Sequence, residues 1–559
     1  MGDWWFYIAA FGIGIIIVIV NMYQAEKSRK KRFLKKLEEE WGKFSEREYS
    51  YEEYECISHY YQSKEYENYI DDITWNDLDM DSIFKAMNNT QSSLGAEVLY
   101  EMLRVPALEE GTLKERERVI RFITEHPEQR TRLQVIFSGI GRTKAYSVTD
   151  YISMLDQVKL SSNGKHVVIA LIALISIVSI FINPIWGLVF VLCAFALSAG
   201  TYYREKGQVE PYLTSFAYVL RMLKASELIQ KENITELKEY CEELKALNKR
   251  FTAFRKNAGL VMGMKSSGSP MDMLFDYVRM FFHVDLLKFN QMVSILKKEK
   301  ESCSRMIGLL GNLEAAIAVA SFRQALPMYS LPEFADTREC FMEAEELYHP
   351  MISEAVSNGI TLKKGALITG SNASGKSTFL KTVAINAILS QSIHTSIAKS
   401  YHAPFFRVYS SMSLRDNLAG NESYYMVEIK ALQRILRASK KGDIPMLSFV
   451  DEVLRGTNTV ERIAASSHIL KELNQRNVLS FAATHDIELT YLLEDEYENF
   501  HFTEEIKEGD ILFSYRLFQG RAQSRNAIKL LELMGYDRQI VESALSCANN
   551  FLETGQWKM

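Results

Sequence analysis

The sequence has little proline, few cysteines and no strong net charge. Its 559 residues include only 10 Pro and 28 Gly, which excludes a collagen-like or low-complexity chain. The six cysteines form no CxxC pair, so neither a disulfide scaffold nor a zinc site is predicted, and a reducing compartment fits their scatter. The net charge of −5 excludes the global basic field of a histone-like DNA binder, so any nucleic-acid contact must come from a local patch.

Charged residues are also missing from two long apolar stretches. The first, Trp4–Ala25, is long enough to cross a bilayer core, which takes about 20 residues. A secretory signal peptide is the alternative, but it would need a basic start and a small-residue cleavage site. The chain instead starts Met-Gly-Asp-Trp-Trp, so we predict an uncleaved anchor over residues 1–25. The basic residues between Lys27 and Lys36 place that side in the cytoplasm and the N-terminus outside.

The second uncharged stretch, His166–Tyr203, has 38 residues, which is about twice the length of one crossing. Asn183-Pro184 lies near its middle and favours a turn. We predict a transmembrane hairpin over residues 166–203, with helices Val167–Ile182 and Ile185–Tyr203. A hairpin buried in a soluble core is the alternative, and the missing polar face counts against it. Three crossings predict a multi-pass protein of the cell (inner, cytoplasmic) membrane, with the rest of the chain in the cytoplasm.

The remaining chain divides by its residue pattern. Residues 26–80 are basic and then acidic and Tyr-rich, which we interpret as a solvated juxtamembrane linker. Residues 81–165 and 204–330 show helical periodicity, and we expect them to form the two parts of a helical core. Basic residues gather between Lys245 and Lys256. This cluster is interpreted either as a nucleic-acid-binding patch or as a solvated helix face. Within residues 331–559, short apolar runs alternate with helical ones, as in a parallel α/β domain.

A buried strand, Gly365–Thr369, is predicted to lead into a glycine-rich loop and a helix. The loop has the GxxxxGK[ST] pattern in the required strand–loop–helix context. Its backbone N–H groups and the helix N-terminus would bind phosphate oxygens. Lys376 would contact the β- and γ-phosphates, and Ser377 would ligate Mg²⁺. We therefore predict an ATP and Mg²⁺ site whose nucleotide-binding residues are Gly370, Ser371, Asn372, Ala373, Ser374, Gly375, Lys376, Ser377 and Thr378.

Two further predicted strands end in side chains suited to the same site. The strand that begins at Met446 ends in Asp451 and Glu452. Asp451 would hold Mg²⁺, and Glu452 would orient the attacking water as the general base. An acidic helix cap after a core strand is the alternative. The next strand, Val478–Ala483, leads to His485, which we predict to contact the γ-phosphate. Glu452, His485 and Lys376 are thus the expected catalytic residues.

Several motifs, in their order along the chain, resemble those of the MutS family of mismatch-repair ATPases. The loop GSNASGKST resembles the family's GPNMGGKST, and the LSGGQ motif of a transporter is absent. Five other segments resemble family motifs, and residues 89–116 resemble the start of its helical core. These segments are Leu347–Pro350 (GRHP), Asp416–Glu428 (DDLxxGxSTFMVEM), Asp451–Thr459 (DE(I/V)xRGTST), Ala483–His485 (ATH) and Leu517–Ala544 (the C-terminal tail).

The resemblance implies a helical lever core on an ABC-like ATPase domain that dimerises to form two composite sites. It implies that Ser423 reaches the γ-phosphate bound to the partner subunit, that Asn372 lies beside the phosphates, and that residues 500–559 help to hold the dimer. The chain departs from the family in three places. Residues 1–80 have the pattern of an anchor and an acidic linker in place of a mismatch-reading domain, the apolar hairpin stands where the levers lead to a DNA clamp, and Arg525-Asn526 replaces the tail's Tyr-Gly.

We therefore expect an α+α/β membrane protein. It would combine a helical lever core with an ABC-like P-loop ATPase domain over residues 331–559 and three transmembrane helices. The expected function is Mg²⁺-dependent ATP hydrolysis in a homodimer, coupled to movement of the helical core. DNA is the partner that the family implies, and membrane lipid is the partner that the apolar stretches imply. The alternative function is an ATP-gated membrane scaffold whose partner is a protein or a lipid.

Overall fold

The chain forms two compact units. The computed structural model describes residues 4–143, 146–154, 163–261, 277–371, 374–412, 424–442, 444–455, 457–474, 477–507, 510–522, 528, 531–532 and 534–557. The helical unit comprises Met1–Glu65, Met87–Glu101 and Arg118–Ala325, and the sheet unit comprises Tyr66–Ala86, Met102–Glu117 and Leu326–Met559. Each unit is therefore assembled from segments that are far apart in the sequence.

The core of the helical unit is α15 (Lys300–Ala325), an apolar helix surrounded by others. It is long and apolar enough to span a membrane, but 83% of its apolar stretch is buried within the protein, so we assign it to the core. Glu314 of α15 accepts hydrogen bonds from the backbone amides of Gln91 and Ser92, the two residues directly before α5. Further described helices that lie wholly or in part in the helical unit are α2 (Tyr51–Gln62), α5 (Ser93–Arg104), α6 (Glu110–Glu125), α7 (Pro127–Ile140), α8 (Val148–Met154), α11 (Lys238–Arg250), α12 (Thr252–Val261) and α14 (Val284–Lys298).

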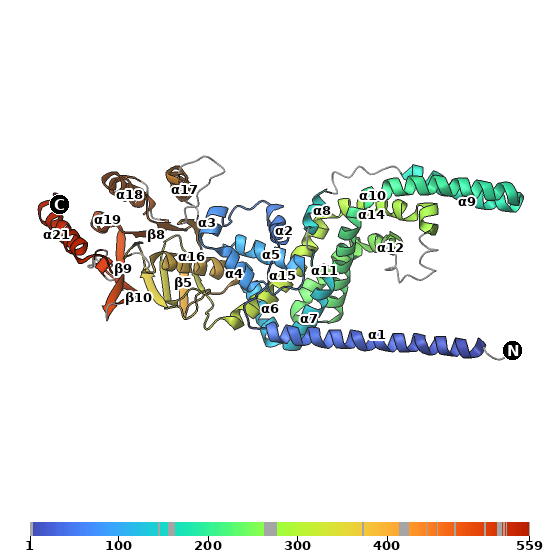
Figure 1. Ribbon diagram of the computed structural model, residues 1–559, viewed down its shortest axis with the longest axis horizontal. Helices are drawn as coiled ribbons and strands as arrows, with labels where there is room; N and C mark the ends of the chain where they lie inside the picture. The colour runs from blue at the N-terminus through green and yellow to red at the C-terminus, as the bar shows by residue number, and fades with distance from the viewer. Residues whose placement is uncertain are drawn as a thin grey trace. The chain divides into compact units, whose positions relative to one another are not determined.

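Two long helices form an apolar hairpin in the helical unit (Figure 1). Helix α9 (Asn163–Ile182) is followed by α10 (Pro184–Lys231), and the Asn183 side chain caps α10 by accepting from the Ile185 and Trp186 amides. Only 22% of the apolar stretch of each helix is buried, and Phe181 is 87% exposed. The predicted turn at Asn183-Pro184 thus lies between the two helices, and α10 continues well beyond the predicted end at Tyr203.

The hairpin turn depends on a glycine. A Cβ atom added to Gly187 would lie 2.5 Å from the Ile180 Cα of the preceding helix, which is closer than any carbon contact permits. Glycine at this position therefore lets α10 approach α9 directly after the turn.

The N-terminal segment forms more structure than the predicted linker. Helix α1 (Trp4–Glu40) runs without interruption from the predicted anchor through the basic residues. Tyr60 of α2 and Trp75 of α3 (Asp72–Asp77) are 1% and 2% exposed. These buried rings differ from the solvated linker expected for residues 26–80.

The sheet unit contains two β-sheets (Figure 1). The six-stranded sheet has the order β10-β9-β4-β8-β7-β6, and its strands are parallel except for β10. Its strands are β4 (Gly365–Thr369), β6 (Arg407–Ser411), β7 (Met446–Asp451), β8 (Val478–Thr484), β9 (Tyr497–Lys507) and β10 (Asp510–Gln519). The four-stranded sheet has the order β1-β5-β2-β3, with β1 (Glu333–Ala335), β2 (Met342–Leu347), β3 (Asn358–Leu362) and β5 (Ser400–Pro404).

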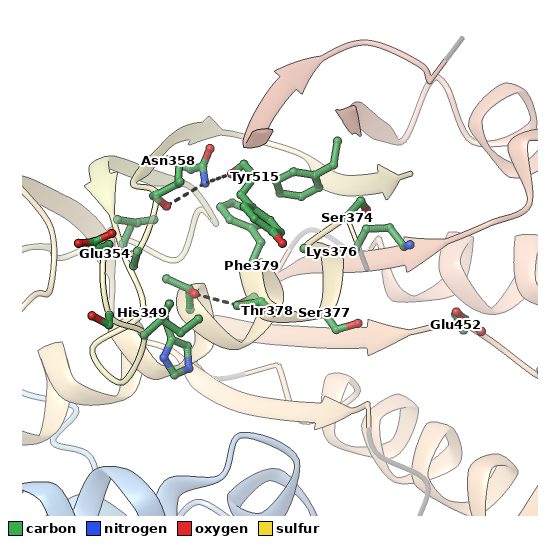
Figure 2. A pocket seen from close by; sticks show the side chains of 18 residues that line it. His349, Glu354, Asn358, Ser374, Lys376, Ser377, Thr378, Phe379, Glu452 and Tyr515 are labelled. Carbon is green, nitrogen blue, oxygen red and sulfur yellow. Dashed lines mark hydrogen bonds between the residues drawn. The ribbon is translucent and has the colours of Figure 1, made fainter. Parts of the chain in front are cut away.

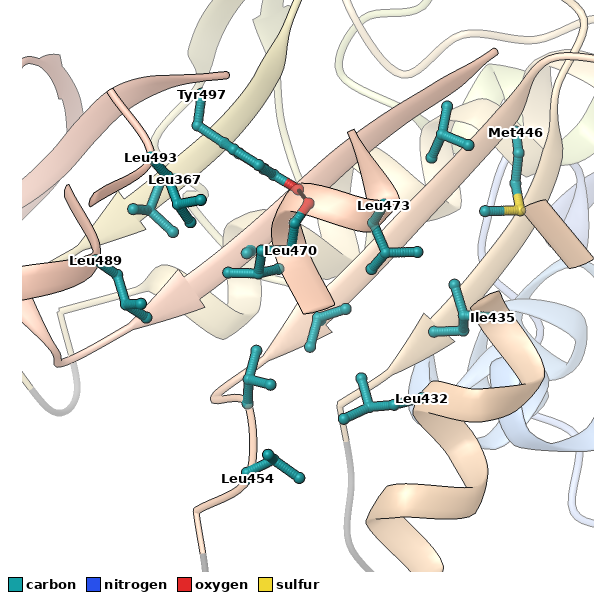
Figure 3. Packing of buried hydrophobic residues seen from close by; sticks show 14 residues of the cluster. Leu367, Leu432, Ile435, Met446, Leu454, Leu470, Leu473, Leu489, Leu493 and Tyr497 are labelled. Atoms are coloured by element: carbon teal, nitrogen blue, oxygen red, sulfur yellow. Dashed lines mark hydrogen bonds between the residues drawn. The ribbon is translucent and has the colours of Figure 1, made fainter. Parts of the chain in front are cut away.

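The central strands β4 and β8 are buried along their whole length, as expected for parallel strands covered on both faces. Figure 3 shows one side of this packing, where Leu367 of β4 belongs to one apolar cluster with Leu432 and Leu470 of two helices. The buried Tyr497 hydroxyl donates to the Leu470 carbonyl over 2.8 Å. The helices of the unit are α16 (Lys376–Ile393), α17 (Tyr424–Ser439), α18 (Thr459–Leu473), α19 (Ile487–Leu492), α21 (Arg538–Thr554) and the N-terminal α3 and α4 (Met80–Met87).

Helix α3 covers the edge strand β6, although more than 300 residues separate them. The Asp77 carboxylate accepts from the Ser410 hydroxyl over 2.7 Å and from the Met412 amide over 2.9 Å. The Ser410 amide donates to the Thr74 hydroxyl over 3.1 Å. These bonds satisfy polar groups that an edge strand would otherwise leave open. Residues 66–80, which the sequence suggested as linker, thereby become part of the sheet unit.

Candidate functional site

The glycine-rich loop joins the end of β4 to the start of α16. Gly370 has φ 151° and Gly375 has φ 106°, which are values that favour glycine. A Cβ on Gly370 would lie 2.8 Å from the Ser374 Oγ and 3.1 Å from the Phe502 carbonyl oxygen. Among the described residues, the buried Ser374 hydroxyl has no hydrogen-bond partner. The two glycine positions thus have backbone conformations that favour glycine, and a buried hydroxyl lies beside Gly370.

Lys376 is held within this loop. Its Nζ donates to the carbonyl oxygens of Gly370 and Ser371, each over 2.9 Å, and lies 3.3 Å from Nε2 of His485. Burial lowers the pKa of Lys376, while the carboxylates of Asp451 and Glu452 act to raise it. The predicted phosphate-binding lysine and the predicted γ-phosphate sensor therefore meet in the structure.

Asp451 ends β7 beside the first turn of α16. The Ser377 hydroxyl donates a hydrogen bond to its carboxylate, and burial raises the pKa of Asp451. A hydroxyl and a carboxylate are the oxygen ligands that Mg²⁺ takes when phosphates and water complete its shell. The described residues contain no group of three or more His, Cys, Asp or Glu side chains that could hold a metal by themselves. The pair accordingly fits a cation shared with a phosphate ligand.

Glu452 and His485 lie together because β7 and β8 run in parallel register. Asp451 is opposite Ala483, and the Glu452 amide donates to the Ala483 carbonyl over 2.9 Å. The Glu452 Oε1 lies 3.1 Å from His485 Nε2, and its Oε2 lies 2.9 Å from Arg455 Nε. The hydrogen bond from His485 lowers the pKa of Glu452 against the opposing effect of burial. The lowered pKa favours the anionic form of Glu452, which lies between His485 and Arg455.

A cavity of about 540 Å³ extends from the loop. Figure 2 shows Lys376, Ser377 and Glu452 on one side of it and His349, Glu354 and Asn358 on the opposite side. The apolar part of its wall was not predicted from the sequence, and it consists of Leu347, Ile352, Val356, Phe379, Phe502 and Tyr515. The space can thus hold a ligand with a phosphate end and a flat apolar end.

Tyr515 is placed over the loop by an irregularity in β10. The pairing of β10 with β9 shifts register between Phe513 and Leu517, and Tyr515 has the left-handed φ of 51°. Asn358 fixes this bulge, because its Nδ2 donates to the Tyr515 carbonyl over 3.0 Å and its Oδ1 accepts from the Leu517 amide over 2.7 Å. The Tyr515 ring then lies 3.2 Å from the position that a Cβ on Gly375 would occupy.

The structure brings most of the predicted site residues together. Thr378 and Ser374 line the cavity with Gly375, Lys376 and Ser377, and Ser371 donates its hydroxyl to Glu504 over 3.0 Å. Asn372, Ala373 and Ser423 lie outside the described residues, as do Arg525 and Asn526 of the tail. One sequence feature pointed to the apolar wall: two of the motifs noted above lie next to wall residues. These motif segments are Tyr348-His349-Pro350 and Leu517–Gly520.

Comparisons with known proteins agree on the C-terminal part of the chain. Residues 366–552 match the family model of MutS domain V. The DNA mismatch repair protein MutS of Thermotoga neapolitana is 32% identical over 245 residues, covering 42% of this chain and 30% of that protein. The MutS proteins of Thermus aquaticus and Thermus thermophilus are 29% and 28% identical over 255 residues, covering 44% of this chain and 30% of each protein. The match thus spans about a third of the length of these relatives.

Proposed function

Because the C-terminal part of this chain belongs to the MutS family, we propose that the protein binds and hydrolyses ATP with Mg²⁺ at the site around Lys376. The observation that carries this proposal is the convergence of Lys376, the Ser377–Asp451 pair and the Glu452–His485 pair at the carboxyl ends of three parallel strands. This is the edge of an open α/β sheet where ligands bind.

Each side chain has a defined part in this reaction. The loop amides and Lys376 bind the phosphates, and Ser377 with Asp451 holds Mg²⁺, which would neutralise charge on the phosphates. Glu452, anionic through its contact with His485, orients a water molecule and accepts its proton. His485 and Arg455 hold the carboxylate in place. We place the base of the nucleotide between the apolar wall residues, with Tyr515 as the stacking ring.

We further propose that the protein is anchored in the cytoplasmic membrane. Support comes from the α9–α10 hairpin, whose apolar side chains are mostly exposed, since monomeric soluble proteins rarely expose large continuous apolar patches. Helix α1 would supply the third crossing, with the N-terminus outside and the sheet unit and the rest of the helical unit in the cytoplasm. The membrane topology predicted from the sequence thus stays a proposal.

The proposed assembly is a homodimer through the sheet units, with Ser423 reaching the partner's nucleotide and ATP turnover moving the helical unit. DNA is one proposed partner, because the relatives are named DNA mismatch repair proteins. The basic cluster offers limited support, since Arg250 lies 3.4 Å from Glu299 and Arg255 pairs with Glu227. The second candidate is an ATP-gated membrane scaffold with a protein or lipid partner, which the exposed hairpin favours.

The test is the ATPase rate of the detergent-purified full chain, compared with Lys376→Ala. We expect turnover that needs Mg²⁺ and is lost in the variant, and equal rates would contradict the proposal. Duplex, mismatched and single-stranded DNA are then added at several salt concentrations. Stimulation that falls steeply with salt would support a DNA-handling role. An ATPase rate that none of these nucleic acids changes would favour the membrane scaffold.

A further inference from the structure

A buried carboxylate on α17 contacts the backbone directly after Glu452. Glu428 is 2% exposed, and its Oε1 accepts hydrogen bonds from two successive amides, those of Leu454 and Arg455, the latter over 3.4 Å. Among the residues that the structure describes, its other oxygen has no hydrogen-bond partner. The carboxylate is therefore directed at one short piece of backbone.

That piece of backbone has an unfavourable conformation. Glu452 and Leu454 have φ values of 59° and 57°, in the left-handed region that side chains other than glycine rarely adopt. Such a conformation persists only when the surroundings of the residue hold it. Leu454 is held on its other side by burial, since its side chain is 5% exposed in the apolar cluster. The two amide bonds to Glu428 are the polar part of this restraint.

The same turn places both oxygens of Glu452. With Leu454 left-handed, the Arg455 side chain folds back so that its Nε lies 2.9 Å from Glu452 Oε2. On the other side, Glu452 Oε1 lies 3.1 Å from His485 Nε2. Without the acceptor on Glu428, the turn would relax toward ordinary φ values, and Glu452 and Arg455 would move together.

We infer that Glu428 is a positioning residue for Glu452: it holds the turn after β7 so that the Glu452 carboxylate faces the Lys376 end of the cavity. This inference rests on the proposed ATP hydrolysis. Glu428 does not line the cavity, so its loss should lower kcat and leave nucleotide affinity unchanged. A displacement of the general base by about 1 Å costs roughly 10²-fold in rate.

The test compares Glu428→Gln, Glu428→Asp and Glu428→Leu in the detergent-purified full chain, with the exposed Gln433→Ala of the same helix as control. Gln keeps an acceptor oxygen at the same reach, Asp withdraws it by one methylene group, and Leu removes it. We expect kcat to fall in the order Gln, Asp, Leu, with Leu about 10²-fold below the wild type. The dissociation constant of a fluorescent ATP analogue should stay within about threefold of the wild-type value for each variant, because the residues that contact the nucleotide are unchanged.

Three results would overturn the inference. Glu428→Leu could turn over ATP at the wild-type rate, Glu428→Gln could be as slow as Glu428→Leu, or affinity and kcat could fall together. If Glu428→Leu does not fold, the comparison of the other two variants decides. A kcat of Glu428→Asp that equals or exceeds that of Glu428→Gln would reject the inference. A wild-type chain without Lys376-dependent turnover would instead refute the proposed function itself, and with it this inference.

Discussion

Acids that are buried or half-buried have different surroundings in the two units. In the sheet unit, Asp451 and Glu452 lie next to Lys376 and His485, and Glu452 pairs with Arg455. In the helical unit, Glu97 is 3% exposed and meets the hydroxyls of Ser147 and Thr149 but, within the described part of the chain, no paired cation. Burial raises the pKa of Glu97 to about 8, whereas contact with His485 lowers that of Glu452.

This difference separates an acid that works by its charge from an acid that is kept neutral. The hydrogen bond from His485 lowers the pKa of Glu452 and so favours its anionic form. Glu97 acts as a neutral hydrogen-bonding group near neutral pH, and it costs stability when it ionises. Replacing each acid by its amide should thus affect catalysis in one unit and pH-dependent stability in the other.

The largest expected effect is on turnover in Glu452→Gln. We expect kcat to fall by about 10²–10⁴-fold, because the amide cannot accept a proton, while ATP affinity and folding are retained. Steady-state ATPase assays and equilibrium nucleotide binding measure the two quantities. The exposed Glu488→Gln on α19 is the control. A normal kcat in Glu452→Gln would show that another group is the base.

The hairpin offers the next test, because an exposed apolar surface must be covered by lipid or face water. Cys193 on α10 is exposed in the structure, whereas Cys547 on α21 is half-buried. In native membranes we expect a hydrophilic maleimide to label Cys193 at least about tenfold more slowly, because the reactive thiolate does not form in apolar surroundings. Mass spectrometry of the labelled peptides measures both rates. Faster labelling of Cys193 would contradict membrane insertion.

The stability of the helical unit should depend on pH through Glu97. Its pKa is about 8 in the folded protein, against an ordinary value of 4.5. The neutral Glu97 side chain therefore contributes its full stabilisation below the ordinary pKa. As pH rises from there toward 8, unfolding releases a proton and stability falls by up to about 1.4 kcal/mol per pH unit. In Glu97→Gln this part of the slope should vanish, with kcat unchanged.

Melting temperatures of the full chain between pH 5.5 and 8.5 measure this slope. The exposed Glu125→Gln, on α6 of the same unit, is the control and should retain the wild-type slope. Identical slopes in the wild type and Glu97→Gln would show that Glu97 is ionised in the folded protein, and the contrast between the two units would fail.

The smallest effect is expected at Asp77, which serves structure in the sheet unit. Asp77→Ala leaves the Ser410 hydroxyl and the Met412 amide without their acceptor, at a cost of about 1–3 kcal/mol for a buried unpaired group. Hydrogen exchange of the peptide covering 407–412 should become faster. Asp72→Ala on the same helix, whose carboxylate is 83% exposed, should change little. Equal exchange in both variants would refute the role of Asp77.

Much of the fold was predictable where local pattern and tertiary packing agree. The strands at Gly365, Met446 and Val478 are mostly apolar runs, and a buried parallel strand needs little more than that. The turn at Asn183-Pro184 follows from the capping side chain and the proline that starts α10. The interpretation of residues 66–80 failed because Thr74 and Asp77 find their partners on β6, which no local pattern records.

The candidate site shows the same division. Lys376, Ser377, Asp451, Glu452 and His485 follow from motifs, since a motif specifies residue types at fixed spacing on a strand or loop. Tyr515 does not, because its place over Gly375 depends on a bulge in β10 that Asn358 holds from another sheet. Glu428 was noted only as the last residue of a motif, and its contact with the Leu454 amide gives that residue a physical role.

By itself the sequence determined the phosphate-binding loop, the acidic strand end and the two uncharged stretches, because each depends on neighbouring residues alone. Tertiary structure decided which apolar helix is core and which is exposed: α15 and the hairpin helices all qualify by length and composition, yet 83% of one and 22% of the others is buried. It also decided which acids carry charge, since Glu97 and Glu452 differ only in the groups that folding brings beside them.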